Sequence, residues 1–248
     1  LAKIFAAAEK KRGKQVTFFD LEDDTDLAAL KDPSLALEHL EGLVVIDEVQ
    51  HLPHLFQPLR VLVDKKNRKV RYLILGSASR DLIKQGSETL AGRIDYVELM
   101  PFSLYETGFG KARKLWIRGG FPPSFLAKSE TDSSAWRKSF IKNFLERDIP
   151  ALGIRIPSAS LRRFWMMLAH YHGQIFNASE LGQSFGIDDH TVRKYLDILS
   201  GTFMIRQLQP WHENLSKRQI KSTKIYFRDS GIFHTLIGIS TSNELVRH

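Results

Sequence analysis

The chain has 248 residues, 43% of them hydrophobic, which is enough apolar material for two or three small domains. It contains no cysteine, and this excludes disulfides, thiolate catalysis and zinc sites with sulfur ligands. The sequence has neither an apolar run of membrane-spanning length nor the segments of a secretory signal, so we expect a soluble, cytoplasmic protein with no membrane partner.

The net charge of +8 is unevenly distributed along the chain. Residues 111–163 carry 12 basic and 4 acidic side chains, whereas residues 1–110 carry 15 basic and 17 acidic ones. A local excess of positive charge attracts polyanions such as nucleic acid or the phosphates of a nucleotide. The alternative is that this cluster forms a solvated helical face.

Apolar periodicity in residues 1–110 predicts strands that alternate with helices. The predicted elements are a helix over residues 1–10, a strand over 16–21, a helix over 25–40, a strand over 43–46, a helix through 55–62, a strand over 70–75, a short helix near 81–84 and a strand over 96–100. This alternation favours a parallel sheet that is covered on both faces. Beyond residue 110 the pattern changes to helices separated by Gly and Pro turns.

One of these predicted strands ends in a motif that is typical of a catalytic site. The apolar run over residues 43–46 is followed by Asp47 and Glu48, which is the arrangement of a Walker B motif. Ligands of open α/β sheets bind at the carboxyl ends of strands, where Asp47 could hold the hydration shell of Mg²⁺ and Glu48 could polarise an attacking water. Two acids after an apolar strand are alternatively an ordinary solvated strand end.

The next strand leads into a cluster of hydroxyl groups. Residues 73–75 are followed by Gly76, Ser77, Ala78 and Ser79, where a polar sensor of the γ-phosphate or of its attacking water would have to lie. We predict that Ser77 is this sensor, whereas Ser79 is the better candidate for a helix N-cap.

Several short segments occur together in this chain. They are Phe19-Asp20-Leu21-Glu22, Val45-Ile46-Asp47-Glu48-Val49-Gln50, Gly76-Ser77-Ala78-Ser79, Leu90-Ala91-Gly92-Arg93, Pro101-Phe102-Ser103, Gly119-Gly120-Phe121-Pro122, Arg147-Asp148 and Ile225-Tyr226-Phe227-Arg228-Asp229-Ser230-Gly231. In this combination, residues 1 to about 235 resemble the bacterial and archaeal AAA+ ATPase family whose C-terminal half is a domain of unknown function.

The resemblance implies binding of ATP with Mg²⁺, with Asp47 and Glu48 in the roles given above. It also implies Arg93 as a residue that stabilises transition-state charge. Such an arginine acts within its own subunit or from a neighbour, so a homo-oligomer or a partner protein is part of this expectation. The alternative is that Arg93 is a structural residue capping the following strand.

The chain departs from the family at the phosphate-binding loop. The sequence holds no Gly-x-x-x-x-Gly-Lys-Ser/Thr, and Gly13-Lys14-Gln15 lacks both the loop length and the hydroxyl that binds Mg²⁺. Residue 1 is Leu, and the first ten residues resemble the helix that follows the loop in the family. We therefore expect the loop and the central first strand to lie immediately upstream, the parent protein to be an ATPase, and these 248 residues to be inactive by themselves.

Residues 177–208 predict a winged helix-turn-helix. Asn177 is placed as the N-cap of a first helix, Gly186 marks a turn, Asp188 can cap a second helix, and residues 203–206 predict a strand of the wing. The candidates for DNA contact on the second helix are His190, Thr191, Arg193 and Lys194. Acidic neighbours nearly balance their charge, so a structural or protein-docking role is the alternative to DNA recognition.

The fold class that we predict is α/β, with four segments. They are a parallel-sheet P-loop NTPase core lacking its first strand (1–110), a basic helical lid (111–163), the winged helix-turn-helix (164–215) and the start of a truncated C-terminal domain (216–248). The leading hypothesis is a fragment of an ATP-hydrolysing AAA+ switch, in which nucleotide state repositions the basic segment and the winged helix. The alternative is a non-catalytic DNA-binding regulator that keeps an ATPase-like fold as a scaffold.

Overall fold

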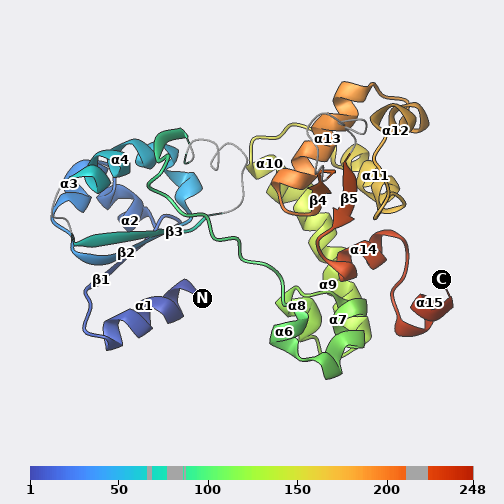
Figure 1. Cartoon of the computed structure of the whole chain (residues 1–248), viewed down its shortest axis with the longest axis horizontal. Helices are drawn as coiled ribbons and strands as arrows, with labels where there is room; N and C mark the ends of the chain where they lie inside the picture. The colour runs from blue at the N-terminus through green and yellow to red at the C-terminus, as the bar shows by residue number, and fades with distance from the viewer. Residues whose placement is uncertain (66–68, 77–85, 87, 211–222, 248) are drawn as a thin grey trace. The chain divides into compact units, whose positions relative to one another are not determined.

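The computed structural model describes residues 1–65, 69–76, 86, 88–210 and 223–247. The chain divides into two compact units, Leu1–Val97 and Glu98–His248. Both are drawn in Figure 1. No described helix combines the length and the apolar character that crossing a bilayer requires.

A parallel three-stranded sheet forms the centre of the first unit. The strands are β1 (Val16–Asp20), β2 (Gly42–Asp47) and β3 (Val70–Ile74), and they lie in the order β1-β2-β3. Both neighbours of β2 run parallel to it, in the register Asp20↔Asp47 on one side and Ile46↔Ile74 on the other. The described part of the unit therefore has the α/β architecture and the parallel sheet that the sequence predicts.

The middle strand is buried on both faces. Residues 43–46 are each at most 3% exposed, and successive side chains point to opposite faces of the sheet. Val44 and Ile46 belong to the cluster that includes Leu37 and Leu59, whereas Leu43 and Val45 pack with Ala2 and Ala6. Helices thus cover both faces of the sheet, as Figure 1 shows.

The covering helices are short. They are α1 (Ala2–Lys11), α2 (Asp24–Ala29), α3 (Pro33–Glu38) and α4 (Phe56–Asp64), with single 3₁₀ turns η1 (Val49–His51) and η2 (Pro53–Leu55) before α4. The expected single helix over residues 25–40 is wrong, because the chain breaks between α2 and α3. Pro33 disfavours helical geometry at Asp32, whose side chain instead caps α3 by accepting from the Leu35 N–H.

The expected strand over residues 96–100 is also wrong. These residues have no strand conformation, and Val97 and Leu99 are 92% and 76% exposed. A strand requires a pairing partner, and β3 is hydrogen-bonded in the described sheet to β2. The helix expected near residues 81–84 lies outside the described residues.

The second unit is mainly helical. Its helices are α6 (Leu104–Thr107), η3 (Phe109–Lys111), α7 (Ala112–Arg118), α8 (Pro122–Phe125), α9 (Glu130–Asn143), the π-helical turn η4 (Phe144–Asp148), α10 (Ile149–Ala151), α11 (Ser158–Ala169), α12 (Ala178–Phe185), α13 (Asp189–Gly201), α14 (Ser230–Leu236) and α15 (Ser242–Arg247). One apolar cluster, from Ile141 to Leu236, contains side chains of the segments 111–163, 164–215 and 216–248.

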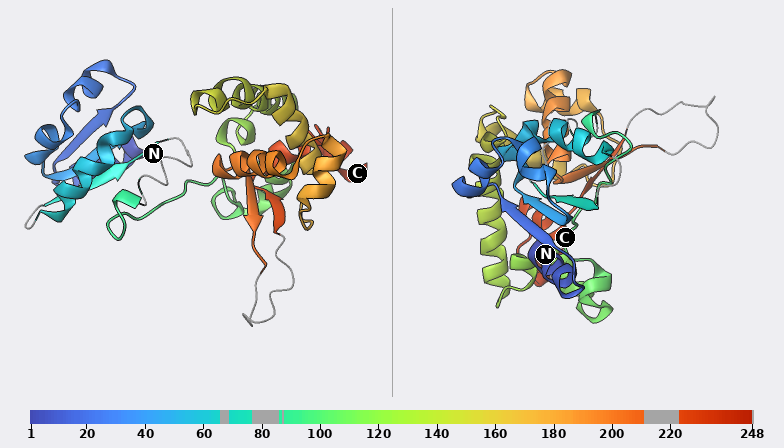
Figure 2. Two further views of the ribbon diagram at one scale, coloured as in Figure 1. Left: turned by 90° about the horizontal axis from the view of Figure 1, so that it is seen from above. Right: turned by 90° about the vertical axis from the view of Figure 1, so that its left-hand side faces the viewer.

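Two helices and a β-ribbon follow one another between residues 177 and 227. Asn177 caps α12, Gly186 ends it with a left-handed conformation, and Asp188 caps α13 by accepting from the Thr191 N–H at 2.9 Å. Strand β4 (Ile205–Leu208) pairs with the antiparallel strand β5 (Lys224–Phe227), and Figure 2 shows the two side by side. The strand begins two residues later than residues 203–206 predict.

Candidate functional site at the carboxyl edge of the sheet

The two predicted acidic residues lie at the carboxyl end of the middle strand. Asp47 is the last residue of β2, and Glu48 follows it as the residue before η1. Both side chains are half-buried. Strand β2 lies between β1 and β3 (Figure 1), so the end of β2 is at the centre of the edge where parallel sheets bind ligands.

The backbone at Glu48 has an uncommon conformation. Its φ of 56° lies in the left-handed region, which residues other than glycine rarely adopt. The Glu48 N–H donates to Asp47 Oδ1 at 3.1 Å, and the side-chain amide of Gln50 donates to Glu48 Oε2. The turn thus holds both carboxylates by local hydrogen bonds.

The end of β3 is tied to this turn. The Leu75 N–H donates to the Ile46 carbonyl at 2.9 Å, and the Val49 N–H donates to the Leu75 carbonyl at 3.0 Å. The chain that leaves β3 therefore starts beside the predicted acidic pair. Ser77, the predicted sensor, lies two residues further on and is outside the described residues.

A third acidic residue joins this edge, Asp20, which belongs to a segment shared with the resembled family but has no role predicted from the sequence. Asp20 ends β1 and is aligned with Asp47 in the parallel register, so the two stand at neighbouring strand ends about 4.8 Å apart. Asp20 Oδ1 accepts from the Glu22 N–H at 3.2 Å. Its position after a short β-rich run was the available signal, but its closeness to Asp47 depends on strand register.

Arg93 does not join the acidic pair in this structure. Its Nε donates to Asp64 Oδ1 at 2.5 Å, and its Nη1 donates to the Ala91 carbonyl at 3.0 Å. The hydrogen bond from Arg93 lowers the pKa of the Asp64 carboxyl. Asp64 ends α4, the helix that leads from the carboxyl end of β2 back to the start of β3, so this pair lies toward the opposite edge of the sheet.

The candidates for DNA contact lie on α13. His190, Arg193 and Lys194 are exposed, whereas Thr191 is half-buried and its hydroxyl donates to Asp188 Oδ2 at 2.8 Å. Thr191 is therefore part of the helix cap. Val192, Tyr195, Leu196 and Leu199 form the buried face of the same helix.

The acidic edge is suited to a cation that keeps much of its water. Within the ranges that the structure describes, no three His, Cys, Asp or Glu side chains gather closely enough to hold a metal ion. Mg²⁺ usually retains several waters and uses one or two carboxylates together with the phosphates of its ligand. Asp20 and Asp47 would fit that smaller requirement if a phosphate-containing ligand supplied the other oxygens.

Comparison with known proteins shows which protein families the two parts of the chain resemble. A family model described as "AAA domain" matches residues 1–108, and a model described as "Domain of unknown function (DUF8612)" matches residues 110–243. The first unit thus has an ATPase-like scaffold. The chain belongs to the family described as this domain of unknown function, whose model matches more than half of it, and its first 108 residues are similar to an AAA domain.

Two curated relatives are strongly similar to this chain. An uncharacterized protein of Mycobacterium bovis and an uncharacterized protein of Mycobacterium tuberculosis are each 51% identical to it over 230 residues. The matched region covers 93% of this chain and 52% of each relative. The chain therefore spans about half the length of the curated relatives it matches.

Proposed function

We propose that this chain is the catalytic-acid part of an ATP-driven switch protein. The observation that carries the proposal is the Asp47-Glu48 pair at the carboxyl end of the middle strand of a parallel sheet, in a chain whose first 108 residues match an AAA domain. Asp47, with Asp20 beside it, would hold the hydration shell of Mg²⁺, and Glu48 would accept a proton from the attacking water.

The local geometry of the acidic pair supports this assignment. Backbone strain in a residue other than glycine is concentrated at functional sites, and Glu48 has such a conformation. The hydrogen bond from Gln50 restricts the Glu48 carboxylate to a narrow set of orientations. A general base needs a fixed position relative to the water that it activates.

Binding of the β- and γ-phosphates at the acidic edge requires a phosphate-binding loop whose motif is absent from this sequence. Backbone N–H groups and the lysine of a glycine-rich loop normally supply most of the binding energy for the β- and γ-phosphates. The sequence has no Gly-x-x-x-x-Gly-Lys-Ser/Thr. We therefore assign nucleotide binding to a longer protein, of the length of the mycobacterial relatives, in which nucleotide state would reposition the second unit.

The test uses a chain extended to the length of the relatives. Glu48→Gln should reduce ATP hydrolysis at least 100-fold while ATP binding stays within about threefold, since loss of a general base lowers chemistry by about 10² to 10⁴. Asp47→Asn should weaken Mg²⁺-dependent ATP binding. An exposed acid away from the edge, Glu38→Gln, is the matched control. Normal hydrolysis by Glu48→Gln would show that another residue activates the water.

The alternative function is a DNA-binding regulator, and the arrangement of α12, α13, β4 and β5 favours it. Two capped helices followed by an antiparallel ribbon form the elements of a winged helix, with Arg193 and Lys194 exposed on the second helix. Arg193→Gln/Lys194→Gln should weaken binding of duplex DNA several-fold and reduce its salt dependence. Unchanged affinity in the double variant would remove α13 as the DNA-contacting helix.

A further inference from the structure

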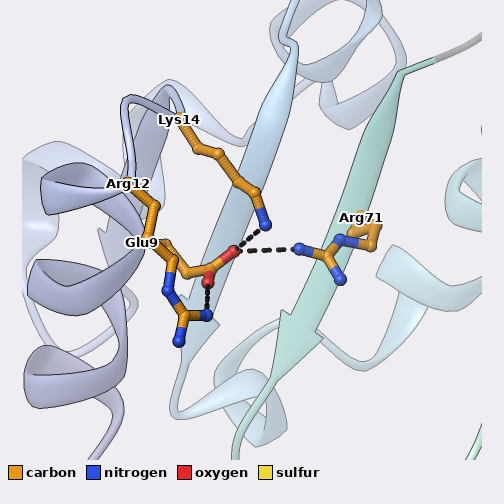
Figure 3. A network of polar contacts seen from close by, with 4 residues as sticks. All are labelled: Glu9, Arg12, Lys14 and Arg71. Carbon is orange, nitrogen blue, oxygen red and sulfur yellow. Dashed lines mark hydrogen bonds and ion pairs between the residues drawn. The ribbon is translucent and has the colours of Figure 1, made fainter.

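The opposite edge of the sheet holds a buried carboxylate among basic side chains. Glu9, near the end of α1, is 2% exposed. Arg12 contacts Oε1 at 2.8 Å, and Lys14 and Arg71 both contact Oε2, at 2.5 and 3.0 Å. Figure 3 shows Arg71 reaching this oxygen from β3, while the other two cations come from the end of α1 and the following loop.

The basic side chains remain accessible. The exposed fractions of the Arg12, Lys14 and Arg71 side chains are 70%, 44% and 64%. Hydrogen bonds from Lys14 and then Arg12 lower the pKa of the Glu9 carboxyl, against the raising effect of burial. One ionised carboxylate thus fixes three cations and leaves a local surplus of two positive charges.

Further cations adjoin this group in the last turn of α1 and just before β3. A hollow of about 390 Å³ beside it is lined by Lys14, Gln15, Glu41, Gly42, Lys69 and Arg71. The amino-edge cluster, as we name it, comprises six cations and two acids: Lys10, Lys11, Arg12, Lys14, Lys69, Arg71, Glu9 and Glu41. Its positive charge is local, since the rest of residues 1–110 carries 9 basic and 15 acidic side chains.

A structural role explains part of this cluster. Cations in the last turn of a helix are stabilised by its dipole, which accounts for Lys10 and Lys11. The contact between Glu9 and Arg71 joins α1 to β3 and helps to dock the helix. Neither reason explains the presence of Lys69, which precedes β3. Neither explains why three cations contact the Glu9 carboxylate, since one cation would neutralise its charge.

The lining of the hollow indicates its ligand. Three cations and the side-chain amide of Gln15 are suited to phosphate oxygens, and the lining residues include no aromatic or large apolar side chain on which a base could stack. Gly42 allows its backbone to pack directly against that of Gln15, because a Cβ at this position would lie 2.3 Å from the Gln15 carbonyl oxygen. The site therefore suits successive phosphates better than a whole nucleotide.

We propose that the amino-edge cluster binds the phosphate backbone of a nucleic acid without reading its bases. The site shares no residue with the acidic edge at Asp47 or with α13, so it goes beyond the proposed function. Arg71 supplies a guanidinium held in place by Glu9, and Lys69 and Lys14 supply accessible ammonium groups along the edge. Such contacts release counterions and make affinity strongly dependent on salt.

The experiment measures the affinity of the full 248-residue chain for a fluorescent DNA duplex by anisotropy, over a salt series. Lys69→Gln/Arg71→Gln should weaken binding about tenfold at roughly 0.1 M salt and lower the slope of log affinity against log salt by about two. Lys11→Gln/Lys69→Gln leaves every cation of the Glu9 network in place and should show a loss in the same direction. This second variant keeps the proposal testable if Arg71→Gln impairs folding.

The control removes the same charge elsewhere in the first unit. Lys31→Gln/Arg60→Gln changes two exposed cations outside the cluster and should bind within about twofold of the original chain. The loss should persist in a chain that also carries Arg193→Gln/Lys194→Gln, which separates this site from α13. Equal affinity of the cluster variants and the control would overturn the proposal. Competition by millimolar inorganic phosphate would overturn it as well, since it indicates a site for single anions.

Discussion

The two units differ in where they place their polar groups. In the first unit residues 43–46 of the middle strand are all apolar and buried, and the buried carboxylate of Glu9 faces cations that remain exposed. In the second unit the polar side chains themselves are buried. Arg137, Asp229 and His234 are 1%, 6% and 2% exposed, and several serines are buried as well. The first unit is thus organised by apolar layers and strand order, and the second also depends on a buried polar junction.

That junction connects distant parts of the sequence. Asp229 accepts from the Gly120 N–H at 2.7 Å and from the Ile232 N–H at 2.8 Å, so it joins the turn after α7 to the start of α14. The two backbones are in close contact, because a Cβ on Gly231 would lie 2.2 Å from the Arg118 carbonyl oxygen. The contact between these two backbone segments therefore requires both a glycine at position 231 and the carboxylate of Asp229.

The largest expected effect comes from removing this carboxylate. Asp229→Ala leaves two buried N–H groups without their acceptor and should lower the free energy of unfolding of the second unit by about 4 kcal/mol. All four tryptophans lie in this unit, so urea unfolding followed by tryptophan fluorescence reports on it. Glu146→Ala, an exposed acid, should change stability by about 0.5 kcal/mol or less. Similar stability of the two variants would show that the junction contributes little.

The contrast between local and tertiary interactions explains what could be predicted from the sequence. The strand before Asp47 and the caps of α12 and α13 depend on neighbouring residues, so local patterns indicate them. The pairing of Arg93 with Asp64 and the alignment of Asp20 with Asp47 depend on tertiary contacts. The strand expected over residues 96–100 fails for the same reason, since strand formation depends on a partner.

The second-largest expected effect is a loss of stability of the second unit at low pH, which depends on His234. Burial lowers the pKa of His234 from 6.5 to about 4, and the positive charges of Arg137 and His172 act in the same direction. The folded unit therefore takes up this proton at lower pH than the unfolded chain, so stability is full above pH 6.5 and is lost as pH falls toward 4. The loss should amount to about 3 kcal/mol.

The measurement compares the original chain with His234→Gln. The difference in their free energies of unfolding, from urea titrations at several pH values, should change by about 3 kcal/mol between pH 6.5 and 4. Other titrating groups, including the buried Asp229, act in both proteins and cancel. A difference that stays constant over this range would mean that His234 does not resist protonation.

The smallest expected effect tests a feature that local sequence does predict. The Asn177 side chain accepts from the Ser179 and Glu180 N–H groups at the start of α12, at 3.1 and 3.4 Å. Asn177→Ala should lower the stability of the second unit by about 1 kcal/mol, and Asn177→Asp should retain most of it. Equal losses for both substitutions would indicate that something other than the cap is responsible.

The central claim is that these 248 residues contain the acids for hydrolysis without the phosphate-binding loop that would hold ATP beside them. Calorimetric titration of Mg²⁺–ATP into this chain tests it directly, with a chain extended to the length of the relatives as the reference. We expect no measurable binding by the 248 residues, because Asp47 and Glu48 add negative charge near an anionic ligand, and clear binding by the extended chain. Tight binding by the 248-residue chain that is lost in Asp47→Asn would contradict this claim, because ATP would then be held at the acidic edge without the loop.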